Sequence, residues 1–277
     1  ILQSFVPGAF GPGAYASDLV ASIYYATDMG ASITSNSWGG TYDSLIESAF
    51  EYADLHGVLS IAAAGNEPTG APSYPGALGS VIGVAATDDR DQPANFSSYY
   101  PEIDVAAPGR AILSTVYPQA PILFYCGNTT VDSYYTECSG TSMATPHVAG
   151  LAGLLKSRNI NITNGQMKTV LRAAVDPIVN APAGQYYGTG RVNAHAALQM
   201  VSPDGNPDIP VATLHHGLAQ SPVSGTITLT GTASGPYTLE YGIGNYPTQW
   251  ITLTNGTAAV TNGPLGTLNT LNVVDGF

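Results

Sequence analysis

Apolar side chains along the first part of the chain follow two different spacings. Two amphipathic helices are predicted at residues 15–30 and 43–57, because apolar positions recur there every three or four residues and each run ends at a glycine. Short apolar runs of strand length occupy residues 31–36, 58–63 and 80–86. Strands that alternate with helices predict an α/β fold, in which these three strands are adjacent, parallel and covered by helices on both faces.

The pattern changes after Val201. Residues 202–210 are rich in proline and glycine and are typical of a linker. Residues 211–277 alternate threonine with apolar side chains between turn residues, which predicts a small all-β, sandwich-like module. The module ends in "VVDGF", a turn signal with no strand after it, so we expect it to be truncated. The predicted domains are therefore residues 1–201 and 211–277.

Charge and composition narrow the possible functions. The chain has 7 Lys+Arg against 19 Asp+Glu and a formal net charge of -12, which argues against nucleic-acid binding. No apolar run reaches the roughly 18 residues that a membrane helix needs. The chain starts without methionine, and we interpret it as a processed or excised piece of a longer protein. The two cysteines, Cys126 and Cys138, could close one loop in an oxidising compartment, or both could be free and buried.

A candidate nucleophile lies in "SGTSMATPHVAG", residues 139–150. Ser142 stands at the start of a predicted helix that runs to about residue 157. Free N–H groups and the positive end of the helix dipole can stabilise an oxyanion there. A serine still needs a base to take its proton. Taken alone, the motif favours a serine that only caps a buried helix.

Three ordered motifs resemble one family. "SGTSMATPHVAG" resembles the nucleophile segment of the subtilisin-like serine peptidases, the subtilases. "NSWGG", residues 36–40, resembles the strand that binds the substrate backbone, and "AAAGNE", residues 62–67, resembles the segment with the oxyanion-hole asparagine. The resemblance covers about residues 1–200. It implies a subtilisin-like sheet and a serine endopeptidase that acts on peptides or proteins.

The resemblance implies a role for individual residues. Ser142 would form the acyl-enzyme, and Asn66 would donate to the oxyanion. Substrate-binding positions would be Gly11, Gly13, Tyr15, Ser37, Trp38, Gly39, Ala63, Ala64 and Gly65. For Trp38 and Tyr15, simple packing in the core is an equally good interpretation. Ser73 and Glu67 would lie around the specificity pocket and indicate a roughly neutral site.

The base and its partner are missing. A subtilase carries them in a pair of segments upstream of the substrate strand, His-Gly-x-His and Asp-x-Gly, and this pair does not occur here. The five histidines have no such surroundings; they are His56, His147, His195, His215 and His216. We therefore expect an inactive fragment, whose activity needs an upstream segment of the same protein with the aspartate and the histidine.

Other functions stay open at this point. One is a catalytically inactive, subtilase-like protein that binds peptides in the same cleft. Another makes the β module the functional part, as an anchor to a surface or polysaccharide, although it shows no aromatic platform.

The resemblance adds expectations beyond the catalytic residues. No cofactor is expected for the chemistry and no metal ligand is assigned, but structural calcium is common in the family. Glu102 and Asp104, with carbonyl groups near Gly76 and Val81, resemble a weaker family cation site; a solvated acidic loop is the slightly favoured alternative. We expect a secreted protein with a Cys126–Cys138 disulfide that holds the loop before Ser142.

Overall fold

The computed structural model describes residues 6–8, 11–116, 134–203, 209–215, 224–243 and 249–273. Cys126, His216 and the final "VVDGF" from residue 274 onward lie outside these ranges, as does most of the predicted linker. In the described part of the chain, no helix is long and apolar enough to cross a membrane.

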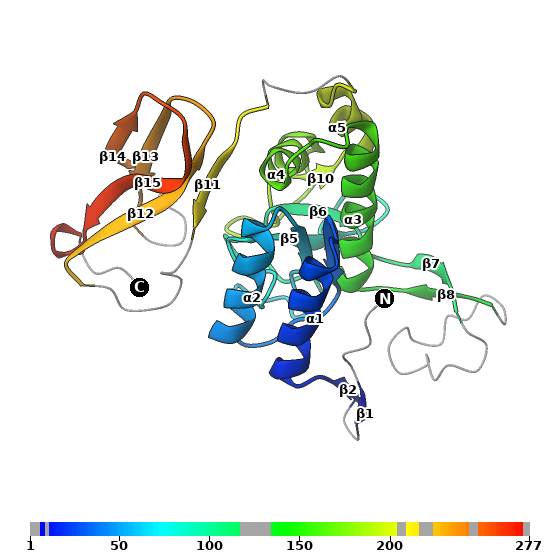
Figure 1. Cartoon of the computed structure of the whole chain (residues 1–277). Coiled ribbons are helices and arrows are strands. Elements are labelled where there is room, and N and C mark those ends of the chain that lie inside the picture. The colour runs from blue at the N-terminus through cyan, green and yellow to red at the C-terminus, as the bar shows by residue number, and fades with distance from the viewer. Residues whose placement is uncertain are drawn as a thin grey trace.

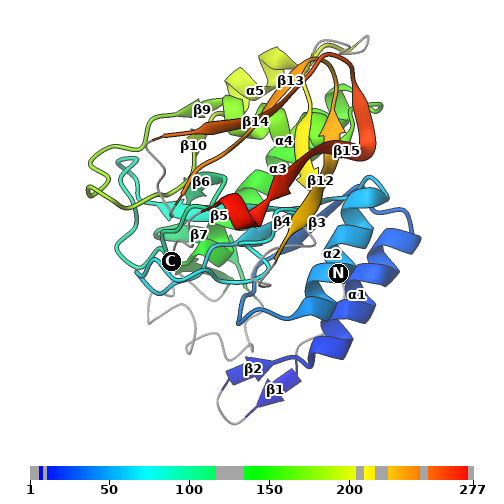
Figure 2. The ribbon, with the colours of Figure 1, turned by 90° about the vertical axis from the view of Figure 1, so that its left-hand side faces the viewer.

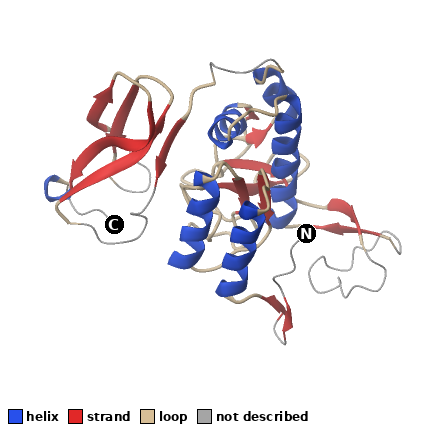
Figure 3. Ribbon diagram, in the orientation of Figure 1, coloured by secondary structure: helices blue, strands red, loops and turns tan. Residues whose placement is uncertain are grey.

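Helices and strands are both present up to residue 200, and strands dominate afterwards (Figures 1 and 3). The helices are α1 (Ala16–Asp28), α2 (Ser44–Leu55), α3 (Thr141–Arg158), α4 (Asn164–Ala173), α5 (Ala194–Met200) and the short 3-10 helix η2 (Thr270–Asn272). The strands up to residue 200 are β1 (Val6–Gly8), β2 (Gly11–Gly13), β3 (Ile33–Asn36), β4 (Leu59–Ala63), β5 (Val81–Thr87), β6 (Val105–Pro108), β7 (Ile112–Thr115), β8 (Tyr135–Cys138), β9 (Val175–Asp176) and β10 (Arg191–Val192). The later strands are β11 (Ala212–His215), β12 (Thr226–Ala233), β13 (Tyr237–Tyr241), β14 (Ile251–Gly256) and β15 (Val260–Asn269).

A central sheet has the strand order β3-β4-β5-β6-β10-β9. Its first four strands are parallel, with Ile33 opposite Leu59 and Ser60 opposite Val81. The predicted strands at residues 31–36, 58–63 and 80–86 are therefore confirmed as neighbours in one parallel sheet. Among the described strands, β3 pairs only with β4, so it forms one edge of the sheet.

Helices cover both faces of this sheet, as predicted. On one face, the apolar side chains of β4 and β5, such as Ile61 and Ile82, pack against α3, α4 and α5. On the other face, alternate residues such as Ala62 and Ala85 pack against α1 and α2. The period of two in a strand sends neighbouring side chains to opposite faces, and both sets are buried here because the sheet lies between two helical layers. Figure 1 shows α1 and α2 side by side, with α3 beyond the sheet.

Local signals explain where the helices begin. The Asp43 side chain accepts hydrogen bonds from the backbone N–H groups of Leu45 and Ile46 at the start of α2. Thr163 and Gln166 form a reciprocal capping box at the start of α4. Pro146 is the sixth residue of α3 and removes one helical N–H, so the carbonyl oxygen of Ser142 is left without its helical donor and accepts from the Ser37 hydroxyl instead.

The C-terminal region consists of antiparallel sheets. One has the order β11-β12-β15 and the other pairs β13 with β14. Among the described apolar side chains of this region, only Ala233, Leu239 and Leu265 are buried in its own core, so this core is small. Figure 2 views the molecule from this side and shows the strands of the β module in front of α3 and α4. The division of the chain into two domains at residues 202–210 stays a prediction.

The β module is attached to the larger region by close contacts. Ile209 is buried in the core that α3, α4 and α5 form with the sheet. The Thr169 hydroxyl donates to the carbonyl oxygen of Pro210 at 2.7 Å. A Cβ atom added at Gly165 would lie 2.8 Å from Cγ1 of Val211, so the absence of a side chain lets β11 approach α4.

Candidate active site

Ser142 and Ser37 meet where β3 ends and α3 begins. The Ser142 hydroxyl donates to the carbonyl oxygen of Ser37 at 3.2 Å, and the Ser37 hydroxyl donates to the carbonyl oxygen of Ser142 at 2.8 Å. Ser142 lies in the first turn of α3, and its backbone N–H has no acceptor in the described part of the chain. The site therefore combines a half-buried hydroxyl with a free N–H at the positive end of a helix.

Asn66 is held beside Ser142 by the residue that precedes Ser142. The Asn66 side-chain oxygen accepts from the backbone N–H of Thr141 at 2.8 Å and from the Thr141 hydroxyl at 3.0 Å. The same hydroxyl accepts from the N–H of Gly65 at 3.1 Å. Because Asn66 uses its oxygen for these bonds, its NH₂ group is left to donate elsewhere.

A glycine makes room for this amide. A Cβ atom at Gly140 would lie 3.3 Å from Nδ2 of Asn66. Roles were predicted for Ser142 and Asn66 but not for Thr141 or Gly140. Gly140 and Thr141 both belong to "SGTSMATPHVAG", and their place in this motif was the sequence signal that could have identified them.

Two backbone segments face each other across Ser73. A Cβ atom at Gly39 would lie 2.5 Å from the Ser73 hydroxyl oxygen, and one at Gly65 would lie 3.3 Å from Cβ of Ser73. The first segment continues into Gly40, which exchanges two backbone hydrogen bonds with Tyr74 at 2.8 and 3.0 Å. Ser37–Gly39 and Ala63–Gly65 therefore form two walls with the Ser73 side chain between them.

Two neutral tyrosines support these walls. Tyr100 is fully buried, its hydroxyl donates to the carbonyl oxygen of Ser73 at 3.3 Å, and burial raises its pKa. Tyr42 donates to Glu47 at 2.5 Å, and this hydrogen bond, together with desolvation, raises the pKa of Tyr42 to about 12. Both hydroxyl groups therefore stay protonated donors at neutral pH.

The remaining predicted binding residues are dispersed. Trp38 packs against Phe50 of α2, with ring centroids 6.1 Å apart, and belongs to the edge of the core. Tyr15 precedes α1 and is 75% exposed. Gly11 and Gly13 belong to β2, whose partner strand is β1. Their position opposite Ser37–Gly39 stays a prediction.

None of the histidines in the described residues contacts Ser142. His147 lies one turn further along α3, and its ring nitrogen is bonded to the carbonyl oxygen of Met143. His56 contacts Tyr52, while His195 lies on α5 and His215 on β11. In the described part of the chain, no histidine is therefore bonded to Ser142, whose hydroxyl lies near the Asn66 amide.

Of the two carboxylates in the predicted weaker cation site, Asp104 is already paired, and the site itself stays a prediction. Asp104 accepts from the N–H of Gly83 at 2.8 Å through one carboxylate oxygen, and from Arg172 at 2.6 to 2.7 Å through the other. Burial raises the pKa of Asp104, and Arg172 opposes this effect. Among the described residues, no group of three or more His, Cys, Asp or Glu side chains could hold a metal ion. Asp104 therefore serves as the partner of a guanidinium group.

The cysteines are only partly covered by the structure. Cys138 is buried on β8, three residues before Thr141. Cys126 lies outside the described residues, so the predicted disulfide stays a prediction.

Comparisons with known proteins agree with this arrangement. A model of the subtilase family matches residues 6–196. The chain is 43% identical over 180 residues to thermitase from Thermoactinomyces vulgaris, which covers 64% of this chain and 57% of thermitase. It is 36% identical over 193 residues to subtilisin Savinase from Lederbergia lenta, covering 69% and 65% of the two chains. The chain thus spans little more than half the length of thermitase.

Solved structures give the same result. A protease from Pseudoalteromonas arctica superimposes with a TM-score of 0.58 and 29% identity, over 68% of this chain and 59% of that chain. The prenylagaramide maturation protease PagA gives a TM-score of 0.58 and 28% identity, over 68% of each chain. Both similarities support the sheet and helix arrangement described above.

Proposed function

Because this chain belongs to the subtilase family, we propose that it carries the nucleophile and the oxyanion-binding half of a serine endopeptidase. The observation that supports this most is the contact between Asn66 and Thr141. It places an amide NH₂ and the free N–H of Ser142 at the start of the same helix, where two donors can meet one oxyanion.

The proposed chemistry uses protein groups and water alone. Ser142 Oγ bonds to the carbonyl carbon of the peptide while its proton passes to a histidine of the upstream segment. The carbonyl oxygen becomes an oxyanion, which accepts from Asn66 and from the N–H of Ser142. The C–N bond then breaks, the amine takes the proton from the histidine, and water releases the acyl group by the reverse sequence.

The substrate is an extended peptide with a neutral side chain before the cut. Ser37–Gly39 offers a backbone edge to which a peptide can add as a strand. Ser73, a small uncharged residue, lies between this edge and Gly65, which favours a neutral side chain there. Glu67 is acidic and exposed near this region. The Ser98 hydroxyl donates to its backbone carbonyl oxygen at 2.6 Å, so the backbone of Glu67 rather than its carboxylate is held there.

The upstream segment supplies the missing aspartate and histidine. The edge strand β3 supports this part of the proposal, because its outer side has no partner among the described strands and leads directly to Ser37. A strand that adds there would end beside Ser142. We further propose that the protein is secreted and that a Cys126–Cys138 disulfide holds the chain before α3.

Phosphonate labelling tests the proposal. A serine-directed fluorophosphonate is added to the 277-residue chain, to the protein extended by its upstream segment, and to the extended protein with Ser142→Ala. We expect fast labelling only in the extended protein with Ser142 intact, because the base that removes the proton from Ser142 is upstream.

A serine on the same helix provides the matched control. Ser157→Ala makes the same chemical change at an exposed position near the other end of α3 and should leave labelling unchanged. Equal labelling of both chain lengths would show that a histidine of this chain acts as the base. Absence of labelling in both would favour the catalytically inactive, peptide-binding alternative.

A further inference from the structure

A large cavity separates the β module from the peptidase region, away from Ser142. Its volume is about 1070 Å³, at the upper end of the roughly 300–1,000 Å³ that small-molecule pockets occupy. One wall comes from the segment Tyr74–Val81, from Glu102 and Asp104, and from α4. The other wall comes from β11, β12, β13 and β15 of the module. The space is therefore large enough for a segment of polypeptide.

The position of the module wall is fixed by specific contacts. Gly165 lets Val211 approach α4, and Thr169 donates to the carbonyl oxygen of Pro210 at 2.7 Å. These contacts hold the first strand of the module against α4. The cavity is thus a defined space between two anchored walls.

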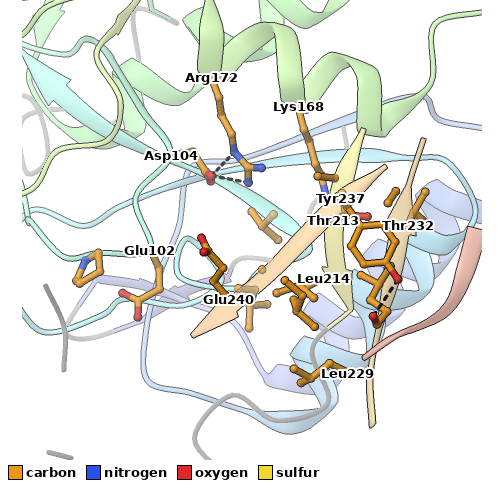
Figure 4. A pocket seen from close by; sticks show the side chains of 18 of the residues that line it. Glu102, Asp104, Lys168, Arg172, Thr213, Leu214, Leu229, Thr232, Tyr237 and Glu240 are labelled. Carbon is orange, nitrogen blue, oxygen red and sulfur yellow. Dashed lines mark hydrogen bonds and ion pairs between the residues drawn. The ribbon is translucent and has the colours of Figure 1, made fainter. Parts of the chain in front are cut away.

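The module wall is largely apolar. Ile227 and Leu229 lie two positions apart on β12 and share one face of the strand, and Leu268 follows on β15. Leu214 and Trp250 also line the space and are 40% and 59% exposed. Figure 4 shows Leu214 and Leu229 of this wall together with Tyr237. An occupant would cover apolar surface that is otherwise open to water.

The charges around the cavity leave an excess of negative charge. Lys168 is paired with Asp54 at 2.8 Å and Arg172 with Asp104 at 2.6 Å, so both cations are already neutralised. Glu102 and Glu240 are exposed, and neither takes part in an ion pair in the described part of the chain. Figure 4 places Glu240 on the module wall, on the side of the paired Asp104 and Arg172. No Lys or Arg follows Arg191 in the sequence, so the module cannot balance these carboxylates itself.

Two strands beside the cavity have a free edge. Among the described strands, β13 pairs only with β14, and β11 pairs only with β12. An unpaired edge offers N–H and C=O groups to another extended chain, and side chains of that chain then fill neighbouring pockets. This feature favours a polypeptide over a small molecule.

We propose that this cavity is a second peptide-binding site, which holds an extended, apolar segment with a Lys or Arg between Glu102 and Glu240. The segment adds to the edge of β13 and belongs to a protein substrate, at a place remote from the scissile bond. The assignment of the segment to a substrate rests on the proposed peptidase function; the binding itself does not need Ser142. The wall segment beginning at Tyr74 directly follows Ser73, so the two sites contact the same loop from two sides.

Photo-cross-linking and fluorescence anisotropy test this site. The probe is a fluorescent peptide in which valine alternates with threonine around one central lysine, with a benzoylphenylalanine at one end. A second probe has glutamine in place of the lysine. Both are added to the full-length protein with Ser142→Ala, which binds peptides without cleaving them. We expect the lysine probe to bind more tightly and to cross-link to cavity residues such as Leu229 or Leu268.

The carboxylates are then removed together. Glu102→Gln with Glu240→Gln should weaken binding of the lysine probe roughly 2- to 30-fold, the range for two partly exposed ion pairs, and should leave the glutamine probe unchanged. Asp18→Asn with Asp89→Asn makes the same charge change at exposed positions away from the cavity and should have no effect. Equal binding of both probes, or cross-links confined to residues 37–40, would overturn the proposal.

Kinetics test whether the occupant is a substrate. In the active protein, the double Glu variant should raise the KM for a protein substrate with basic β-strand segments and leave the KM for a short peptide unchanged. If the probe binds but the KM for the protein substrate does not change, the occupant is not a substrate, although the cavity still binds peptides. Failure of Ser142 labelling would instead concern the proposed peptidase function alone.

Discussion

Thr141→Val removes one hydroxyl group from the centre of the candidate active site without changing the shape of the side chain. Thr141 is fully buried, and its hydroxyl links the N–H of Gly65 to the side-chain oxygen of Asn66. In the variant, Asn66 keeps only the bond from the N–H of Thr141. Its amide is then less firmly held in the orientation that points the NH₂ group at the oxyanion.

The magnitude follows from the bond that is lost. A hydrogen bond of this kind contributes about 0.5–1.5 kcal/mol, which corresponds to a roughly 2- to 12-fold fall in the population of the productive orientation. We expect kcat of the full-length protein to fall by that factor, with KM nearly unchanged, because the oxyanion forms only on the way to the transition state. Asn66→Ala removes the donor itself and should cost about 10²–10³ in kcat.

Stability provides a second measurement on the same variant. The N–H of Gly65 loses its acceptor, and a partly buried, unpaired donor costs about 1–3 kcal/mol. Urea unfolding should show this loss in Thr141→Val. Thr141→Ser keeps the hydroxyl and should recover most of the kcat and of the unfolding free energy.

The assay is steady-state hydrolysis of a peptide anilide, at a temperature where all variants are folded by circular dichroism. Unchanged kcat in Thr141→Val would show that Thr141 does not orient Asn66. A loss as large as that of Asn66→Ala, or a Thr141→Ser variant as poor as Thr141→Val, would equally refute the reasoning.

Two further predictions concern the module and the cysteines. Gly165→Ala should weaken the packing of the β module against α4, because the new Cβ would lie 2.8 Å from Val211, and limited proteolysis within residues 202–210 should become faster. Gly153→Ala is the control, because nothing lies within 4 Å of its new Cβ. It should leave proteolysis unchanged and stabilise α3 by about 0.5–1 kcal/mol. Thiol titration of the denatured, unreduced protein should find no free cysteine, and Cys138→Ser should lower the unfolding free energy by about 2–3 kcal/mol; two titrating thiols would contradict the disulfide.

Local sequence signals predicted the elements that depend on local chemistry. The apolar spacing located α2, and the short apolar runs located β3, β4 and β5. In each case the signal and the structure involve the same few residues. The helix that begins beside Ser142 was also predicted to within a residue or two.

The strand β15 shows why other elements were missed. Its sequence contains Gly263, Pro264 and Gly266, which are typical of turns. The strand forms nevertheless, because a proline is tolerated at a bulge or on an edge strand. Pro264 lies where the register against β12 shifts, and β15 pairs only with β12 in its sheet. That compensation depends on a partner strand distant in sequence, and no local pattern contains it.

The role of Thr141 was hidden for the same reason. Its hydroxyl acts through two hydrogen bonds to residues distant in sequence: it donates to Asn66, 75 positions earlier in the chain, and accepts from the backbone N–H of Gly65. The resemblance to a family identified Ser142 and Asn66 as separate residues. The physical link between them appears only when the end of β4 and the start of α3 are brought together by packing.

The same contacts indicate how the site can be completed by an upstream segment. Ser37, Asn66 and Ser142 are positioned by β3, β4 and α3, whose buried side chains pack within one core. The local geometry of Asn66 and Ser142 therefore rests on these elements and on the adjoining residues Gly65 and Gly140. On the open side, β3 has no partner among the described strands, so a strand could add there without breaking the pairing with β4. We propose that the upstream segment joins the chain at that edge, so that the labelling experiment restores the base while the donors at Asn66 and Ser142 stay in place.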